Sequence, residues 1–185
     1  LKCRVFGEGG NLGITQKGRI EFALAGGACN TDFIDNAGGV DCSDQEVNIK
    51  IALNSEVVNN ELTLDDRNQL LVEMTADVER RVLHHNYRQT QLISLAKTRA
   101  STNISDFWQC ISDWEASGFL NRQLETLPDD ETLVEREKSG QFLTRPEVAV
   151  LASYSKIIFK QQLSETDIDK DSFVQQELSK AFPQL

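Results

Sequence analysis

The sequence predicts a mainly α-helical fold that follows a short, loop-rich first region. Nine of the 11 glycines lie in the first 45 residues. Glycine disfavours helices more than any residue except proline, so its scarcity in the later chain favours helix there. Helix-capping patterns and apolar residues at helical spacing recur after residue 43. Hydrophobic residues make up 39% and charged residues 26% of the 185 positions, which allows a packed core.

The first region predicts a strand, a glycine-rich turn and a helix, in that order. Residues 1–6 have the apolar content of a short buried strand. Glycines follow it at positions 7, 9, 10 and 13, and a helix is expected at about 19–25. Residues 26–46 are rich in loop-forming residues, with a short extended piece expected at 32–34.

Capping patterns start the first two helices of the later region. Ser43-Asp44-Gln45-Glu46 places a serine hydroxyl where it can bond a free helix N–H, and a glutamate that can reach back. The apolar residues of this helix share one face: Val47, Ile51 and Val58. A weaker pattern at residues 63–66 precedes a long helix that runs to residue 96 or beyond. Its apolar stripe consists of Leu71, Met74, Val78 and Val82.

Further helical segments follow to the end of the chain. Large apolar residues predict a helix at 104–119, and residues 121–139 predict an exposed acidic segment with a short helix. Thr144-Arg145-Pro146-Glu147 has a capping threonine, a proline in the first turn and a glutamate at the third position, so a helix begins there. Its apolar face is expected to include Ala149, Ala152, Ile157 and Phe159. A last helix is expected at about 172–181.

Charge and composition exclude several classes of function. The net charge of −10 argues against nonspecific binding to nucleic acid or to anionic membranes. No apolar run approaches the ~18 residues that cross a bilayer, and no signal peptide is visible. Four cysteines at low density suit a reducing cytoplasm, where we expect the protein. Because the chain begins with Leu1, we expect it to be a piece of a longer protein.

No metal site is expected from the sequence. The cysteines at 3, 29, 42 and 110 do not have the spacing of a zinc site. The adjacent His84 and His85 would point about 100° apart on a helix. The acidic residues at 129–131 and near 167–171 lack the glycine that a calcium loop needs, so we interpret them as solvated faces.

Two glycine motifs are the candidates for ligand binding. Gly7 and Gly9 begin a G-x-G-x-x-G fingerprint, but Leu12 stands at its third glycine. The motif therefore either binds a pyrophosphate or forms a tight turn. The second motif, Asn36-Ala37-Gly38-Gly39-Val40-Asp41-Cys42-Ser43, directly precedes the predicted helix start. It either attracts a carboxylate or phosphate to the helix N-terminus, or is a turn with an ordinary cap.

Together the two motifs resemble those of glutamate dehydrogenases. The chain reads EGGNLGIT at 8–15 and NAGGVDCSDQE at 36–46, in the order and spacing of that family. The sequence of these motifs is more similar still to that of the large bacterial NAD-specific glutamate dehydrogenases. These also have a helix similar to LTRPEVAVLASYSKI at 143–157. The resemblance covers at least residues 4–51 and 143–157, and residues 73–95 are also similar to the family.

The resemblance implies a fold and a set of site residues. Residues 1–46 would form the C-terminal edge of a Rossmann-like α/β domain that binds NAD, and residues 47–185 a helical C-terminal domain. Asn11 and Asn36 match asparagines near the nicotinamide and its ribose. Ser43 matches a serine that contacts the side-chain carboxylate of glutamate, although its hydroxyl is also a suitable helix cap.

The resemblance also implies a function. The whole enzyme would oxidatively deaminate L-glutamate to 2-oxoglutarate and ammonia, with an upstream dehydrogenase core as partner and a homo-oligomer as its assembly. The catalytic lysine, the catalytic aspartate and the first glycine fingerprint of the family have no match here, and Lys2 and Lys17 lack the matching context. We therefore assign no catalytic residue and expect the chain alone to be inactive. The alternative is a noncatalytic helical interaction or oligomerisation module that uses the glycine motifs only as turns.

Overall fold

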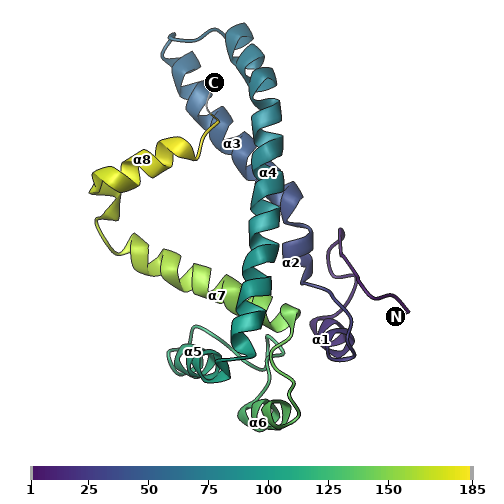
Figure 1. Ribbon diagram of the computed structural model, residues 1–185. Helices are drawn as coiled ribbons and strands as arrows, with labels where there is room; N and C mark the ends of the chain where they lie inside the picture. Colours follow the sequence, from purple (N-terminus) through teal and green to yellow (C-terminus); the bar gives the residue numbers. More distant parts are fainter. Residues whose placement is uncertain (1, 184–185) are drawn as a thin grey trace. The chain divides into compact units, whose positions relative to one another are not determined.

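The protein is mainly helical in a computed structural model that describes residues 2–183 (Figure 1). The helices are α1 (Gln16–Leu24), α2 (Asp32–Asp35), α3 (Ala37–Val58), α4 (Leu64–Ala100), α5 (Ile104–Ala116), α6 (Asp130–Lys138), α7 (Arg145–Ser164), the 3₁₀ helix η1 (Ile168–Lys170) and α8 (Ser172–Lys180). This confirms the predicted helical body after residue 46. The short acidic helix is α6, and the expected last helix is α8.

The contacts within the chain group its residues into two compact units. Unit 1 consists of Leu1–Asn36 and Arg88–Leu163, and unit 2 of Ala37–Tyr87 and Ser164–Leu185. The long helix α4 contributes residues to both. The predicted domains, residues 1–46 and 47–185, refer to parts of a whole enzyme, and that division stays a prediction.

The core of unit 1 is built from the end of α4 and from α5, α6 and α7. The apolar side chains that form it are Ile34, Ile93, Ala100, Ile104, Ile111, Leu120, Leu127, Leu133, Leu143, Val148, Ala149, Val150 and Leu151. Residues 146–151 of α7 are buried in succession, so this stretch near the start of α7 is covered on all sides. The predicted apolar face of α7 was wrong at its far end, because Ile157 and Phe159 are exposed.

A buried ion pair joins α6 to the start of α7. Glu147 is fully buried, and its carboxylate accepts hydrogen bonds from the Thr144 N–H at 2.6 Å and the Thr144 hydroxyl at 2.7 Å. The Arg136 guanidinium of α6 donates to both Glu147 oxygens, at 2.8 and 3.0 Å. The glutamate therefore accepts an N–H at the start of its own helix and also binds a second helix. The helix start that the sequence predicts here is confirmed.

The structure differs from two sequence-based predictions near the start of unit 1. The predicted strand at residues 1–6 is reduced to an isolated parallel bridge between Val5 and Ala28, and Val5 is 72% exposed rather than buried. Leu1 itself lies outside the described residues. Two short extended segments without further partners pair only marginally, which accounts for the single bridge. The extended piece expected at 32–34 is instead part of α2.

Unit 2 contains the hairpin of α3 and the first part of α4 (Figure 1). The predicted stripe of α4 is half-buried at all four positions, and a threonine cap at its start is confirmed, because the Asp66 N–H donates to the Thr63 hydroxyl at 3.1 Å. On α3, however, the buried residue is Ile49. The predicted apolar face of α3 (Val47, Ile51 and Val58) is exposed.

Arg81 of α4 holds the end of α8 within unit 2. Its guanidinium donates to the carbonyl oxygens of Lys180 at 2.9 Å and Phe182 at 2.8 Å, and its Nε donates to Asp77 at 2.6 Å. The last carbonyls of a helix have no partner within the helix and carry partial negative charge. Arg81 supplies both hydrogen bonds and a compensating charge there.

Candidate functional site

Two asparagines of unit 1, one from each glycine motif, lie in contact. Asn11 lies in the glycine turn before α1, and Asn36 is the residue between α2 and α3. The Asn36 amide nitrogen donates to the Asn11 amide oxygen at 2.9 Å, and the pair is exposed to solvent. The structure therefore brings together the two predicted cofactor residues, which are 25 positions apart in the sequence.

The turn that carries Asn11 is held by acidic side chains. Asp35 accepts a hydrogen bond from the Glu8 N–H at 3.1 Å, and Asp32 accepts one from the Leu12 N–H at 3.0 Å. Both aspartates come from the single turn of α2. The turn is thus fixed at both ends by one short helix, which determines where Asn11 lies.

A buried ion pair lies beneath this turn. Glu8 and Arg19 are each 95% covered, and their side chains pair at 2.6 Å. The second oxygen of Glu8 accepts a hydrogen bond from the Gly13 N–H, and Arg19 also lies 3.4 Å from Asp32. Burial alone raises the pKa of the Glu8 carboxyl, but the hydrogen bonds from Arg19 and Gly13, with the charge of Arg19, hold the pKa below its ordinary value. Glu8 therefore stays ionised at neutral pH and keeps the turn closed.

Leu12 stands in the turn with an unusual backbone. Its φ is 60°, in the left-handed region that glycine adopts most easily, and its side chain is 82% exposed. A left-handed residue with a side chain costs about 1–2 kcal/mol. The hydrogen bond from its N–H to Asp32 offsets part of that cost.

Ser43 occupies a different position from the predicted one. Helix α3 begins at Ala37, so Ser43 is an exposed residue inside the helix and not its cap. The predicted capping box was therefore wrong. The preceding residues Ala37–Cys42 continue the helix despite two glycines. Ser43 belongs to unit 2, whereas Asn11 and Asn36 belong to unit 1.

Sequence reasoning missed the residues that support the turn. Glu8, Arg19 and the two aspartates of α2 were not singled out, although the spacing of Asp32 and Asp35 places both on one helical turn.

Asp41, within the second glycine motif, was also missed. Its carboxylate contacts His85 Nδ1 of α4 at 2.9 Å and thereby ties the start of α3 to its partner helix. Only knowledge of which distant segments meet could have identified these residues.

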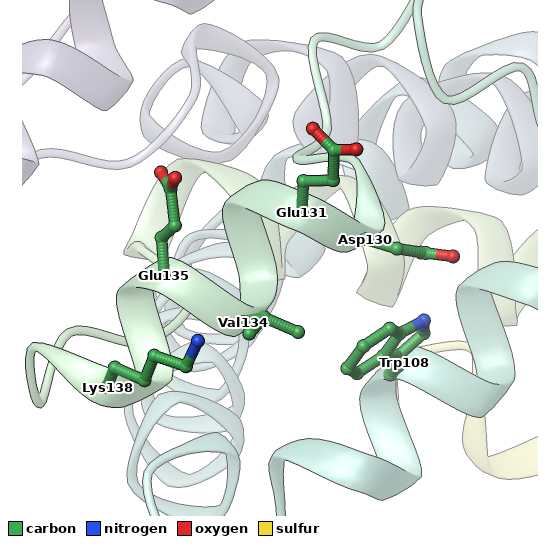
Figure 2. A pocket seen from close by; sticks show the side chains of 6 residues that line it. All are labelled: Trp108, Asp130, Glu131, Val134, Glu135 and Lys138. Atoms are coloured by element: carbon green, nitrogen blue, oxygen red, sulfur yellow. The ribbon is translucent and has the colours of Figure 1, made fainter.

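Unit 1 also contains a shallow pocket of about 390 Å³. It is lined by Trp108 of α5 and by five residues of α6: Asp130, Glu131, Val134, Glu135 and Lys138. Figure 2 shows Val134 pointing toward the Trp108 indole, while Glu131 and Glu135 point away from it. The pocket contains none of the predicted site residues, and its carboxylates belong to a solvated helix face.

The described residues add two observations about metals and membranes. Within residues 2–183, no three histidine, cysteine or acidic side chains are grouped so that they could hold a metal ion. None of the helices in the same range is both long and apolar enough to cross a membrane. All four cysteines are free thiols, and burial raises the pKa of the Cys29 thiol.

Two protein-family models match parts of the chain and show which family it belongs to. The family model described as bacterial NAD-glutamate dehydrogenase, catalytic domain, matches residues 1–96, more than half of the chain. The chain belongs to this family. A second model, described as glutamate dehydrogenase, C-terminal, matches residues 140–185. The first model thus covers both glycine motifs, and the second covers the α7 motif.

Curated relatives agree along the whole chain. The NAD-specific glutamate dehydrogenase of Pseudomonas aeruginosa is 54% identical over 185 residues, which is 100% of this chain and 11% of that protein. The protein of the same name from Halomonas elongata is 49% identical over 185 residues, or 12% of its length. That of Mycobacterium tuberculosis is 40% identical over 184 residues, or 11% of its length. The chain therefore spans about a tenth of the relatives that it matches.

Proposed function

We propose that this chain is the part of an NAD-dependent glutamate dehydrogenase that forms the nicotinamide side of its cofactor site. The whole enzyme would oxidise L-glutamate to 2-oxoglutarate and ammonia. Bound NAD⁺ accepts the hydride, and this chain's residues orient the cofactor. The observation that carries the proposal is the Asn11–Asn36 pair, which joins the two family motifs at one exposed point.

The asparagine pair has suitable groups for this cofactor. The hydrogen bond between them uses the amide oxygen of Asn11 and one N–H of Asn36. The amide nitrogen of Asn11 and the amide oxygen of Asn36 are not part of that bond. A nicotinamide carboxamide and ribose hydroxyls contain both donors and acceptors, so one amide nitrogen and one amide oxygen suit them. The buried Glu8–Arg19 pair under the turn limits its movement, which reduces the entropy lost on binding.

The upstream dehydrogenase core of the same polypeptide is the partner that we propose for the exposed apolar residues. Val40, Val47, Ile51 and Val58 form a stripe along α3, and all are more than half exposed. A stripe of this kind is typical of a surface that another part of the protein covers. The match of residues 1–96 to a catalytic-domain model, and the small share of the relatives' length, support that occupant. The Val5–Ala28 bridge would then continue a parallel sheet as the edge of a Rossmann-like domain.

Ser43 is proposed as the contact for the side-chain carboxylate of glutamate. Its exposure on α3 is compatible with that role.

We also propose that the whole enzyme is a homo-oligomer in the cytoplasm. Size-exclusion chromatography with light scattering on the full-length enzyme tests the assembly, because a monomeric mass would contradict it.

The activity is tested with two proteins. We expect the full-length enzyme to form NADH from NAD⁺ and L-glutamate, and the 185-residue chain to show no turnover above a control without protein. The chain contains no match for the catalytic lysine or aspartate. NADH absorbance measures both reactions. Turnover by the isolated chain would contradict the assignment of catalysis to the upstream core, and an inactive full-length enzyme would contradict the proposed function.

A further inference from the structure

Arg145, the first residue of α7, contacts α4 and the segment before α2 within unit 1. Its Nε donates to the Asn30 amide oxygen at 2.9 Å. Its Nη1 donates to the Ser94 hydroxyl at 2.8 Å, and its Nη2 to the Thr90 carbonyl oxygen at 3.3 Å, both on α4. One planar guanidinium thus connects α4, α7 and the segment before α2.

The contact at Asn30 continues to the turn that carries Asn11. With its oxygen bound to Arg145, the Asn30 amide directs its nitrogen to Asp35 Oδ1 at 2.8 Å. Asp35 Oδ2 then accepts the Glu8 N–H at 3.1 Å. Each hydrogen bond fixes the orientation of the next group, because the amide and the carboxylate each have two distinct ends.

We propose that Arg145 is a positioning residue for the cofactor site, which it fixes through Asn30 and Asp35. The proposal rests on the proposed function, since it concerns the turn that would contact the nicotinamide. It gives the α7 motif a role in the reaction, although α7 lies in a different part of the sequence from both glycine motifs.

The location of Arg145 separates this role from packing. The neighbouring residues 146–151 are buried and supply the core contacts of α7, whereas Arg145 is only half-buried. A neutral side chain at position 145 leaves those core contacts in place. Its main effect should therefore fall on the orientation of Asn30 and the turn, and not on folding.

The test uses initial-rate kinetics of the full-length enzyme. Arg145→Gln is expected to raise the KM for NAD⁺ by roughly two- to thirtyfold, with kcat and the KM for glutamate changed less than about twofold. Arg145→Lys should restore little, because an ammonium group cannot reproduce the three directed contacts. Arg99→Gln is the matched control: Arg99 is on α4, is 67% exposed and pairs with Asp106.

A double-mutant cycle with Asn30→Ala shows whether Arg145 acts through Asn30. The double variant should be no worse than the more affected single variant, because both remove the same connection. Additive effects on the KM for NAD⁺, or an unchanged KM in Arg145→Gln, would overturn the positioning role while the wild-type activity remains. A wild-type enzyme that does not oxidise glutamate with NAD⁺ would overturn the proposed function and this inference together.

Discussion

Replacing Glu147 by alanine is expected to lower the free energy of unfolding of the chain by about 3–5 kcal/mol. The substitution leaves the Arg136 guanidinium, which is only 12% exposed, without its carboxylate. It also removes the acceptor of the Thr144 N–H and hydroxyl at the start of α7. A buried charge and a buried donor both lose their partners, and this combination is among the most destabilising effects of a single substitution.

Urea unfolding followed by far-ultraviolet circular dichroism measures this effect. Glu147→Gln should fall between alanine and wild type, because one acceptor oxygen remains while the charge is lost. Glu131→Gln, on the exposed face of α6, is the control and should change the free energy of unfolding by less than about 0.5 kcal/mol. A Glu147→Ala protein as stable as this control would show that the ion pair does not hold α6 to α7.

Replacing Ser43 in the full-length enzyme is expected to affect glutamate more than NAD⁺. Loss of a hydrogen bond to a charged carboxylate costs about 1.5–3 kcal/mol, so Ser43→Ala should raise the KM for glutamate roughly ten- to a hundredfold. Ser43→Asp should raise it further, because two like charges repel. Ser43 lies inside α3 and is exposed, so alanine there should not weaken the helix.

Because Ser43 lies inside α3, its replacement separates an effect on substrate binding from an effect on helix stability. A change in KM without a change in thermal stability points to the ligand, since no helix cap is lost. Ser55→Ala, at another exposed serine of α3, should leave both KM values unchanged. A normal KM for glutamate in both Ser43 variants would reject the substrate contact.

The sequence predicted local structure best where one short segment determined it. The helix start predicted at Thr144-Arg145-Pro146-Glu147 is confirmed, because α7 begins at Arg145 and Glu147 accepts hydrogen bonds from the Thr144 N–H and hydroxyl. The cap at Ser43 was wrong although its pattern looked equally good. There α3 begins six residues earlier, and two glycines did not stop it. A capping pattern identifies a possible helix start, but tertiary packing decides whether the helix begins there.

The candidate site was predicted only in part. The resemblance selected Asn11 and Asn36, and the structure places them in contact. It could not select Arg145, which bonds Asn30 from 115 positions further along the sequence. Nor could the apolar pattern of α3 show which of its faces is covered, because Ile49 and Ile51 are equally hydrophobic and only the first is buried.

The binding of NAD⁺ to the full-length enzyme, measured by isothermal titration calorimetry without glutamate, tests the central claim most directly. If Asn11 and Asn36 form the nicotinamide side of the site, Asn36→Ala and Asn11→Ala should each raise the Kd by roughly two- to twelvefold, the value of one neutral hydrogen bond. Asn54→Ala, at an exposed position of α3, should keep the wild-type Kd. Wild-type Kd values in both site variants would contradict the claim.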